Sequence, residues 1–259
     1  MDTLSTVFEV AADSYDRFMG RYSRPLAAHF IEFAGLQTGW KVLDVGAGPG
    51  ALTTALVEML GPESVAAADP SPPFVEANRE RHPGVDVQLA GAEDMPFADN
   101  AFDAALAQLV VQFMTDPVAG LGEMARVTKP GGVVAACVWD YGTGRSPLST
   151  IWAAAIEADP SVEGEGDRVG VARGQLAEVF AQAGLDAVVE SEVAVTVEHE
   201  SFEAWWEPMT FGVGPAGAWL ARQTPDVQER VRERCRVMYP DAPGMRTAVA
   251  WAARGRSPG

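Results

Sequence analysis

The sequence is poor in cysteine and in positive charge. Its two cysteines, Cys137 and Cys235, are too far apart to form a disulfide framework or a metal-ligand cluster, so no metal site is expected and a reducing environment fits best. Lysine and arginine total 19 against 36 aspartates and glutamates, which leaves a formal net charge of −17. Because such a charge repels nucleic acids and anionic membranes, we expect neither as a partner.

Long hydrophobic runs are also lacking. The longest apolar stretches, near 104–111 and 132–139, are too short to span a bilayer. The N-terminal segment carries Glu9, Asp13 and Asp16 where a secretory signal would begin with cationic residues. The sequence therefore predicts a cytoplasmic protein, and its 259 residues suit a single α/β domain with small additions.

What the sequence does contain is an alternation of short apolar segments and helical patterns, separated by glycine and proline. Strands are expected at 41–45, 64–68, 85–90, 101–108, 133–139, 187–197 and 247–253, and helices at 51–60, 72–81, 117–128, 147–158 and 175–183. Asp116 and Pro117 are typical of a helix start. The pattern predicts a mostly parallel seven-stranded sheet with helices on both faces and one reversed strand at the edge.

Three segments fall outside this alternation. An N-terminal helical segment, 1–36, is expected to act as a lid, and two insertions, 141–173 and 201–244, are expected to form a cap over the substrate. Within the first insertion, the glycine- and acid-rich loop Glu163–Asp167 is typical of a solvated, mobile segment. The segment 40–140 remains as the predicted cofactor-binding core.

The segment Val42–Gly50, with the sequence VLDVGAGPG, carries the strongest functional pattern. Glycines after a buried strand let the backbone pass close beneath a nucleotide-like ligand, and the next helix presents free N–H groups. Asp69 ends the following strand, where its carboxylate can accept hydrogen bonds from both hydroxyls of a ribose. The alternative is that Asp69 only caps the helix that begins after Ser71.

A nicotinamide dehydrogenase uses a similar turn, and Gly46, Gly48 and Ala51 formally satisfy its glycine pattern, with Asp69 as the acid. Asp44, however, lies inside the first strand, where its charge would repel a pyrophosphate. A cofactor with an ammonium and a sulfonium centre, such as S-adenosylmethionine, fits these carboxylates better.

Four segments together give a resemblance to a known family. They are Val42–Gly50, then Asp69-Pro70-Ser71, then 91–106 with the sequence GAEDMPFADNAFDAAL, and finally 123–132 with the sequence EMARVTKPGG. In this order they resemble class I S-adenosylmethionine-dependent methyltransferases related to the ubiquinone/menaquinone C-methylases. The resemblance implies a Rossmann-like seven-stranded sheet of order 3-2-1-4-5-7-6 with one antiparallel strand, and S-adenosylmethionine as the cofactor.

The resemblance also implies roles for individual residues. The expected cofactor-binding residues are Tyr15, Met19, Arg24, Asp44, Gly46, Ala47, Gly48, Asp69, Pro70, Ala92, Glu93, Gln108 and Leu109. Among them, Asp44 would lie near the amino group of the methionine part, Ala92 and Glu93 against the adenine, and Gln108 and Leu109 opposite the sulfur. Relatives often carry two histidines shortly after this point. This chain has Gln112-Phe113, which excludes an imidazole base there.

The acceptor site is less well defined by the sequence. His199 is a candidate general base and Asp140 could orient an acceptor hydroxyl, with a structural role as the alternative for each. Aromatic residues are expected to wall a pocket for a flat or hydrophobic acceptor, the alternative being a small satellite core. These candidate substrate-binding residues are Trp139, Tyr141, Trp205, Trp206 and Phe211.

The function expected from these patterns is methyl transfer from S-adenosylmethionine to a small, hydrophobic or aromatic acceptor at oxygen, carbon or nitrogen, by a monomer or homodimer. Two alternatives stay open. One is an enzyme of the same fold that binds the cofactor but catalyses a non-methylating cyclisation. The other is an NAD(P)-dependent oxidoreductase.

Overall fold

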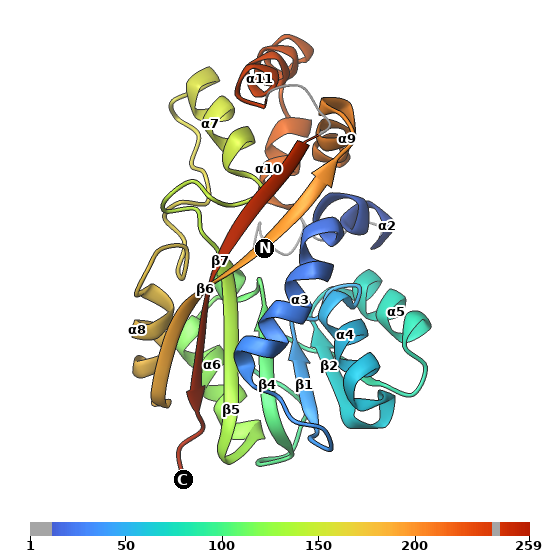
Figure 1. Cartoon of the computed structure of the whole chain (residues 1–259), viewed down its shortest axis with the longest axis vertical. Coiled ribbons are helices and arrows are strands. Elements are labelled where there is room, and N and C mark those ends of the chain that lie inside the picture. The colour runs from blue at the N-terminus through green and yellow to red at the C-terminus, as the bar shows by residue number, and fades with distance from the viewer. Residues whose placement is uncertain (1–11, 240–243) are drawn as a thin grey trace.

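The computed structural model describes residues 12–239 and 244–259, and a seven-stranded sheet runs through their centre (Figure 1). Residues 1–11, which include Glu9, and residues 240–243 lie outside the described part. The first third of the expected lid segment, 1–36, and the end of the second expected insertion, 201–244, are therefore not covered.

The strand order is β3-β2-β1-β4-β5-β7-β6. The strands are β1 (Val42–Val45), β2 (Val65–Asp69), β3 (Asp86–Leu89), β4 (Phe102–Gln108), β5 (Thr128–Trp139), β6 (Asp186–His199) and β7 (Gly244–Arg256). The pairs among β1 to β5 are parallel, whereas β7 runs antiparallel to both β5 and β6. The predicted fold and strand order are confirmed. The reversed strand, β7, lies one position inside the edge at which it was expected.

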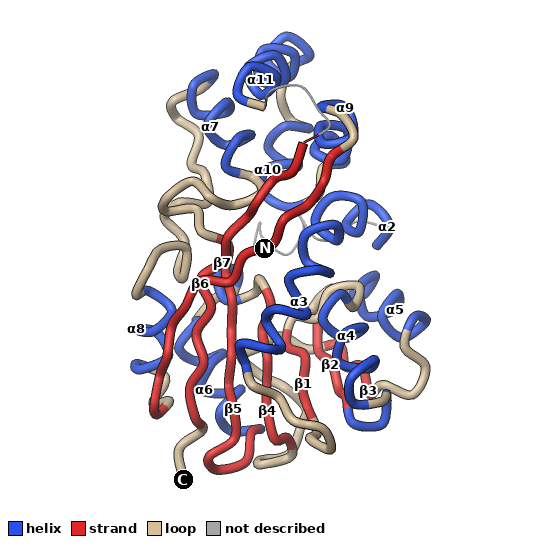
Figure 2. Tube along the Cα trace, viewed as in Figure 1, coloured by secondary structure: helices blue, strands red, loops and turns tan. Residues whose placement is uncertain are grey.

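Helices cover both faces of the sheet and form a separate layer above it (Figure 2). The helices are α2 (Ala12–Tyr15), the π-helical turn η1 (Asp16–Gly20), α3 (Arg21–Ala34), α4 (Ala51–Leu60), η2 (Pro62–Ser64), α5 (Pro72–Arg81), η3 (Val111–Phe113), α6 (Pro117–Val127), α7 (Ser149–Ala158), α8 (Gln175–Gln182), α9 (Phe202–Trp206), η4 (Glu207–Phe211), α10 (Gly214–Ala221) and α11 (Pro225–Met238).

Alternation along the buried strands feeds two hydrophobic cores. In β4, Ala104 and Leu106 pack in the core that contains residues of α3 and α4, while Ala105 and Ala107 pack in the core that contains residues of α6 and α8. Successive side chains of a strand point to opposite faces, so both faces of these strands must be apolar. This is why the parallel strands read as continuous apolar runs in the sequence.

The last two strands extend beyond their expected bounds, β6 by three residues and β7 by six. Their pairing continues from Val189 opposite Arg254 to His199 opposite Gly244, and both strands run past the sheet into the upper layer (Figure 1). There α7, α9, α10 and α11 surround their ends, and α7 contacts α11. The two expected insertions therefore meet in one cap, hereafter the cap, even though they are separate in sequence.

Most element boundaries in the core agree with the predictions from sequence. Helices α4 and α5 have the expected bounds, and Asp116 caps α6 by accepting a 3.0 Å hydrogen bond from Ala119 N–H. Strand β5 begins at Thr128, earlier than expected. The expected turn at Gly131 does not end the strand but lies within it, where the pairing with β4 shifts register. The left-handed φ of Gly131, 75°, makes that irregularity possible.

Candidate functional site

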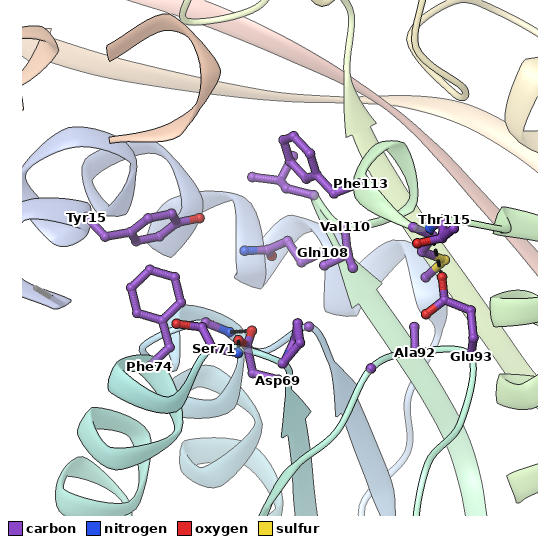
Figure 3. A pocket seen from close by; sticks show the side chains of 16 residues that line it. Tyr15, Asp69, Ser71, Phe74, Ala92, Glu93, Gln108, Val110, Phe113 and Thr115 are labelled. Carbon is purple, nitrogen blue, oxygen red and sulfur yellow. Dashed lines mark hydrogen bonds between the residues drawn. The ribbon is translucent and has the colours of Figure 1, made fainter. Parts of the chain in front are cut away.

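A cavity of about 260 Å³, hereafter the larger cavity, lies at the carboxyl ends of β1, β2 and β4 (Figure 3). This is the edge at which open α/β sheets bind their ligands. Its lining residues are Tyr15, Gly46, Gly48, Asp69, Pro70, Ser71, Phe74, Gly91, Ala92, Glu93, Gln108, Leu109, Val110, Phe113, Met114 and Thr115. The cavity thus brings together Tyr15 from the lid and eight residues expected from the sequence to bind the adenosine or the sulfur side of the cofactor. These eight are Gly46, Gly48, Asp69, Pro70, Ala92, Glu93, Gln108 and Leu109.

The glycine turn forms the floor of this cavity with its backbone. Gly46 and Gly48 adopt left-handed φ angles of 67° and 55°. A Cβ on Gly46 would lie 2.5 Å from a methyl carbon of Val110, so no larger residue fits there. A Cβ on Gly48 would meet nothing within 4 Å, which leaves the backbone conformation as the reason for glycine. Ala47 is buried and lies outside the lining residues.

Asp69 lies at the end of β2 and joins the glycine turn to the start of α5. One carboxylate oxygen accepts a hydrogen bond from Gly48 N–H and the other accepts one from Ser71 N–H, each at 2.8 Å. Burial raises the pKa of Asp69 to about 6, and the two backbone hydrogen bonds oppose that rise. Both hypotheses from the sequence thus describe part of its environment: Asp69 supports the helix start, and it also lines the cavity.

Asp44 is only 1% exposed and lies beneath the turn, outside the lining residues of the larger cavity. It accepts a 2.7 Å hydrogen bond from the hydroxyl of Thr53 in α4. Burial raises the pKa of Asp44 to about 7, and the charge of Asp69 adds to the rise. A direct contact between Asp44 and a ligand is not part of this geometry, so its expected role depends on an intervening water molecule or on its field alone.

The N-terminal helical segment covers one side of the larger cavity. Tyr15 packs edge-on against Phe74 of α5, with ring centroids 5.2 Å apart, and both rings lie beside Asp69 (Figure 3). Met19 is buried but lines a different cavity, described below. Arg24 is exposed, pairs with Asp16 at 2.9 Å and lines neither cavity. The expected closure over the cofactor therefore fits Tyr15, whereas Arg24 points to solvent.

The opposite side of the larger cavity contains the expected adenine residues. Ala92 is buried, and Glu93 lies near the start of α6 (Figure 3). The Glu93 carboxylate accepts hydrogen bonds from Thr115 N–H at 2.8 Å and Asp116 N–H at 3.3 Å. Because one oxygen of this carboxylate is occupied by the loop before α6, the group holds the cavity wall in place.

Gln108 and Leu109, at the end of β4, line the larger cavity. Gln108 donates a 2.9 Å hydrogen bond to Ser23 C=O in α3, which ties the lid helix to the sheet. Leu109 has a φ of 65°, unusual for a residue with a branched side chain. Its N–H donates to Cys137 C=O at 2.8 Å and its carbonyl accepts from Gln112 at 3.0 Å, so the surroundings hold a conformation that costs about 1–3 kcal/mol.

A second cavity of about 30 Å³, hereafter the smaller cavity, adjoins the first, because Tyr15, Leu109 and Phe113 line both. Its lining residues are Tyr15, Phe18, Met19, Leu109, Gln112, Phe113, Trp139, Tyr141, Leu148, Glu165, Gly214 and Pro215. They come from the lid, the ends of β4 and β5, and the cap. Two of the candidate substrate-binding residues, Trp139 and Tyr141, are among them.

The candidate base His199 lies outside both cavities. It is 3% exposed, and its Nε2 lies 2.8 Å from the hydroxyl of Tyr22. Its Nδ1 lies 3.4 Å from Arg21, an orientation in which the guanidinium donates and Nε2–H points to Tyr22. Burial and the charge of Arg21 lower the pKa of His199 to about 4. This environment corresponds to the structural alternative for His199.

Asp140 likewise lies outside the lining residues of both cavities. It accepts hydrogen bonds from Thr143 N–H at 2.9 Å and from Arg145 Nε at 2.7 Å, and its Oδ2 also accepts from the Thr143 hydroxyl. Burial alone would raise the pKa of Asp140, but these hydrogen bonds and the Arg145 charge lower it. Asp140 therefore holds the loop after β5 in place through these hydrogen bonds, which is the structural role that the sequence left open as its alternative.

The three aromatic candidates of the second insertion form part of the cap core. Trp205 stacks on Tyr239 with centroids 4.6 Å apart, and Trp206 stacks on Phe202 at 6.1 Å. Phe211 lies beneath the guanidinium of Arg17. None of the three lines either cavity, because their rings pack against other side chains of the cap and of the lid. The satellite-core alternative describes their place.

Two features of the site were missed from the sequence. The first is that Phe74 and Phe113 line the larger cavity. Phe113 could have been predicted as a site residue, because the Gln112-Phe113 pair stands where relatives often carry two histidines. The loop Glu163–Asp167 was expected to be solvated, yet its Glu165 is 2% exposed and lines the smaller cavity. Nothing in the local sequence distinguishes Glu165 from its exposed neighbour Glu163, because only contacts with distant residues bury it.

Across residues 12–239 and 244–259, no group of three or more histidine, cysteine, aspartate or glutamate side chains is arranged to hold a metal ion. Within the same ranges, no helix combines the length and the apolar character needed to cross a membrane.

With this geometry in place, comparisons with known proteins identify the fold. Residues 43–136 match the sequence family described as a methyltransferase domain. The fold is that of a class I methyltransferase. A structure from Thermotoga maritima described as a SAM-dependent methyltransferase, a possible histamine N-methyltransferase, superimposes with a TM-score of 0.59 at 18% identity, covering 98% of this chain and 99% of that one. The resemblance that the four segments indicated is confirmed.

Curated proteins that are similar in sequence to this chain extend the comparison. The ubiquinone/menaquinone biosynthesis C-methyltransferase UbiE of Burkholderia orbicola (strain MC0-3) is 37% identical over 147 residues, covering 52% of this chain and 60% of that protein. The chain spans between 50% and 64% of the length of the curated relatives it matches. The [4+2]-cyclase SpnF also has the fold, with a TM-score of 0.60 at 21% identity, covering 91% of this chain and 82% of that one.

Proposed function

We propose that this protein transfers a methyl group from S-adenosylmethionine to a small acceptor. The observation that carries the proposal is Asp69, whose two oxygens are each held by a backbone N–H at 2.8 Å while the carboxylate lines the larger cavity. Each oxygen keeps a lone pair, so the carboxylate can accept both hydroxyls of a ribose without moving.

The charges around the larger cavity favour a cationic nucleoside over a dinucleotide. Its described lining residues include the carboxylates Asp69 and Glu93 but no lysine, arginine or histidine. Asp44 lies just beneath the glycine turn and adds a further titratable carboxyl. A pyrophosphate would enter this acidic site without a cationic partner, whereas a sulfonium and an ammonium would be attracted. The oxidoreductase alternative is therefore disfavoured.

Bound S-adenosylmethionine would supply an activated methyl group that needs no further electrophilic assistance. The residues of this chain would then hold the ribose at Asp69, cover the nucleoside with Tyr15 and Phe74, and align an acceptor in the smaller cavity. Leu109 and Phe113, which line both cavities, mark the passage between cofactor and acceptor. Exclusion of water and alignment of the two reactants supply the catalytic effect in this proposal.

The lining of the smaller cavity suits a small and largely apolar acceptor, and because the cavity measures about 30 Å³, the cap must move outward to admit one. The smaller cavity is lined mainly by Phe18, Met19, Trp139 and Leu148, together with residues shared with the larger cavity. We propose no nucleic acid and no membrane as partners, because a net charge of −17 opposes both. Monomer and homodimer fit this function equally well.

The test is a binding comparison followed by a transfer assay. Calorimetry with S-adenosylmethionine, S-adenosylhomocysteine, NAD and NADP should give binding of the two sulfur nucleosides alone. Incubation with methyl-labelled cofactor and a panel of small aromatic acceptors should then place label in a product. Binding of NAD in preference to the sulfur nucleosides would refute the proposal.

A second candidate function is a cyclisation without methyl transfer, which the fold similarity to a [4+2]-cyclase brings into consideration. In that case the nucleoside would bind, the acceptor would be converted, and no label would enter the product. The same assay therefore separates the two functions.

A further inference from the structure

Glu165 is a buried carboxylate in the wall of the smaller cavity. Its side chain comes from the loop between α7 and α8, and it is 2% exposed. The indole N–H of Trp152 donates to its Oε2 at 2.9 Å, and the hydroxyl of Tyr141 donates to the same oxygen at 3.1 Å. Two donors from different elements thus fix the orientation of the carboxylate.

The second oxygen of Glu165 is available. Among the described residues, none donates a hydrogen bond to Oε1, although Glu165 lines the cavity and the charge of Arg168 acts on it from a distance. A carboxylate that is fixed through one oxygen in a largely apolar cavity wall, and whose other oxygen can still accept a hydrogen bond, is typical of a ligand-binding group. Burial raises the pKa of Glu165, and the donors and Arg168 oppose the rise.

Two other side chains in the same wall carry polar atoms without a partner. Oε1 of Gln112 and Nε1 of Trp139 are both buried and make no hydrogen bond with any described residue. Both residues line the smaller cavity, whose other lining side chains are mainly apolar. The cavity thus combines an apolar body with a few polar groups, which is the usual composition of a small-molecule site.

We propose that Glu165 is the specificity-determining residue of the acceptor site and that it binds a hydrogen-bond donor, a hydroxyl or a protonated amine, carried by a small apolar or aromatic acceptor. This inference rests on the proposed function, because it assigns the smaller cavity to the acceptor. The apolar walls hold the body of the acceptor, while Oε1 accepts the proton of its single polar group.

The Glu165→Gln variant gives a specific test of this assignment. Since Trp152 and Tyr141 both donate to Oε2, the glutamine must turn its carbonyl oxygen toward them. Its amide N–H2 then occupies the place of Oε1, and the cavity wall changes from a hydrogen-bond acceptor to a donor. A donor-bearing ligand should therefore lose affinity, while a ligand with only an acceptor oxygen should not.

The probes are phenol, benzylamine in its protonated form, and anisole, measured by ligand-observed NMR titration with and without S-adenosylhomocysteine. In the wild-type protein, phenol or benzylamine should bind about tenfold or more tightly than anisole. In Glu165→Gln, benzylamine should lose its binding, and the ratio of phenol to anisole should approach one. The comparison of phenol with benzylamine decides between a hydroxyl and an amine as the natural donor.

The matched control is Glu163→Gln, which makes the same chemical change at an exposed position of the same loop. This control should keep the wild-type preference. If Glu165→Gln fails to fold, wild-type crystals soaked with phenol serve instead, and the phenol oxygen should lie within hydrogen-bond distance of Glu165.

Three results would bear on the proposals separately. An unchanged preference for phenol over anisole in a folded Glu165→Gln protein, or phenol bound elsewhere in the crystal, would overturn the role of Glu165 and leave cofactor binding intact. Failure of the wild type to bind S-adenosylhomocysteine would refute the proposed function instead. The probe titrations without nucleoside would still decide whether Glu165 selects donors.

Discussion

Arg81 of α5 lies 2.8 Å from Asp16 in the N-terminal helical segment, and the same guanidinium donates a 2.9 Å hydrogen bond to Pro49 C=O in the glycine turn. One side chain thus connects the lid to the floor of the larger cavity. Asp16 also pairs with Arg24. The lid that carries Tyr15 is therefore held to the cofactor side of the sheet by charge as well as by apolar packing.

The first prediction concerns this contact. Asp16→Asn should weaken S-adenosylhomocysteine binding about fivefold, because a partly buried ion pair is worth about 1 kcal/mol. Asp13→Asn is the control, since the Asp13 side chain is 95% exposed and lies 3.6 Å from the same arginine. Calorimetry on both variants measures the difference. Equal affinities for Asp16→Asn and Asp13→Asn would mean that the ion pair does not hold the lid closed.

The second prediction concerns Asp69 and the ribose. Asp69→Ala should reduce the affinity for S-adenosylmethionine at least tenfold, which is about 1.4 kcal/mol. A fall in stability is also expected, since Gly48 N–H and Ser71 N–H lose their acceptor. The two effects are separated with adenosine and its 2′,3′-dideoxy analogue. The wild type should prefer adenosine, and Asp69→Ala should bind both equally weakly; a preserved preference would remove Asp69 from the ribose site.

The third prediction is a pH dependence of stability. The pKa of Asp44 is about 7 in the folded protein against an ordinary value of 3.8, so the folded state holds its proton more tightly than the unfolded state. The free energy of unfolding should therefore fall as the pH rises from about 4 to about 7. Asp69, with a pKa of about 6, acts in the same direction.

Asp44→Asn removes the larger of these two contributions. It should flatten the fall in stability and leave the variant more stable than the wild type at pH 8 by about 2 kcal/mol. Thr53 can still donate its hydroxyl to the asparagine oxygen, so the packing is kept. Chemical denaturation at pH 4.5, 6 and 8 measures the slopes. Parallel slopes for wild type and variant would contradict the raised pKa.

The fourth prediction concerns His199. Its pKa is lowered from 6.5 to about 4, so the unfolded state takes up a proton between these values and the folded state does not. The contribution of His199 to stability should be complete above pH 6.5 and should be lost as the pH falls toward 4. His199→Gln should remove this pH dependence, while His29→Gln, at an exposed site, should not.

The same variant decides whether His199 takes part in catalysis. Because the imidazole lies outside both cavities and bonds to Tyr22, nucleoside binding and methyl transfer near pH 7.5 should change less than about twofold in a folded His199→Gln protein. A loss of activity by about a hundredfold, with the affinity for S-adenosylhomocysteine preserved, would restore it as a general base.

The cofactor side of the site was predictable because its chemistry is local. The turn at Gly46 and Gly48 follows a strand directly, and Asp69 ends the next strand, so the carboxyl ends of β1 and β2 bring them together in any parallel pairing. Asp44 was placed correctly in the strand, but its depth beneath the turn was not predictable, since the sequence does not tell how far the turn covers it.

The acceptor side was not predictable to the same degree. Trp205 and Trp206 are aromatic in a helical insertion whether they line a pocket or fill a core, and the structure uses them in the core. Glu165, by contrast, was expected to be exposed to solvent and is buried in a cavity wall. Its burial depends on Trp152 and Tyr141, which approach it only after the loop between α7 and α8 folds back over the end of β5.

The sequence by itself determined the order of strands and helices, the buried sheet and the glycine turn with its acid, because each depends on apolar periodicity or on backbone conformations that few residues adopt. Only the tertiary structure decided which polar groups line a cavity and which are buried and hydrogen-bonded elsewhere. The reason is that burial of His199, Asp140 and Glu165 is set by partners from distant segments, and no local pattern encodes the space those partners leave.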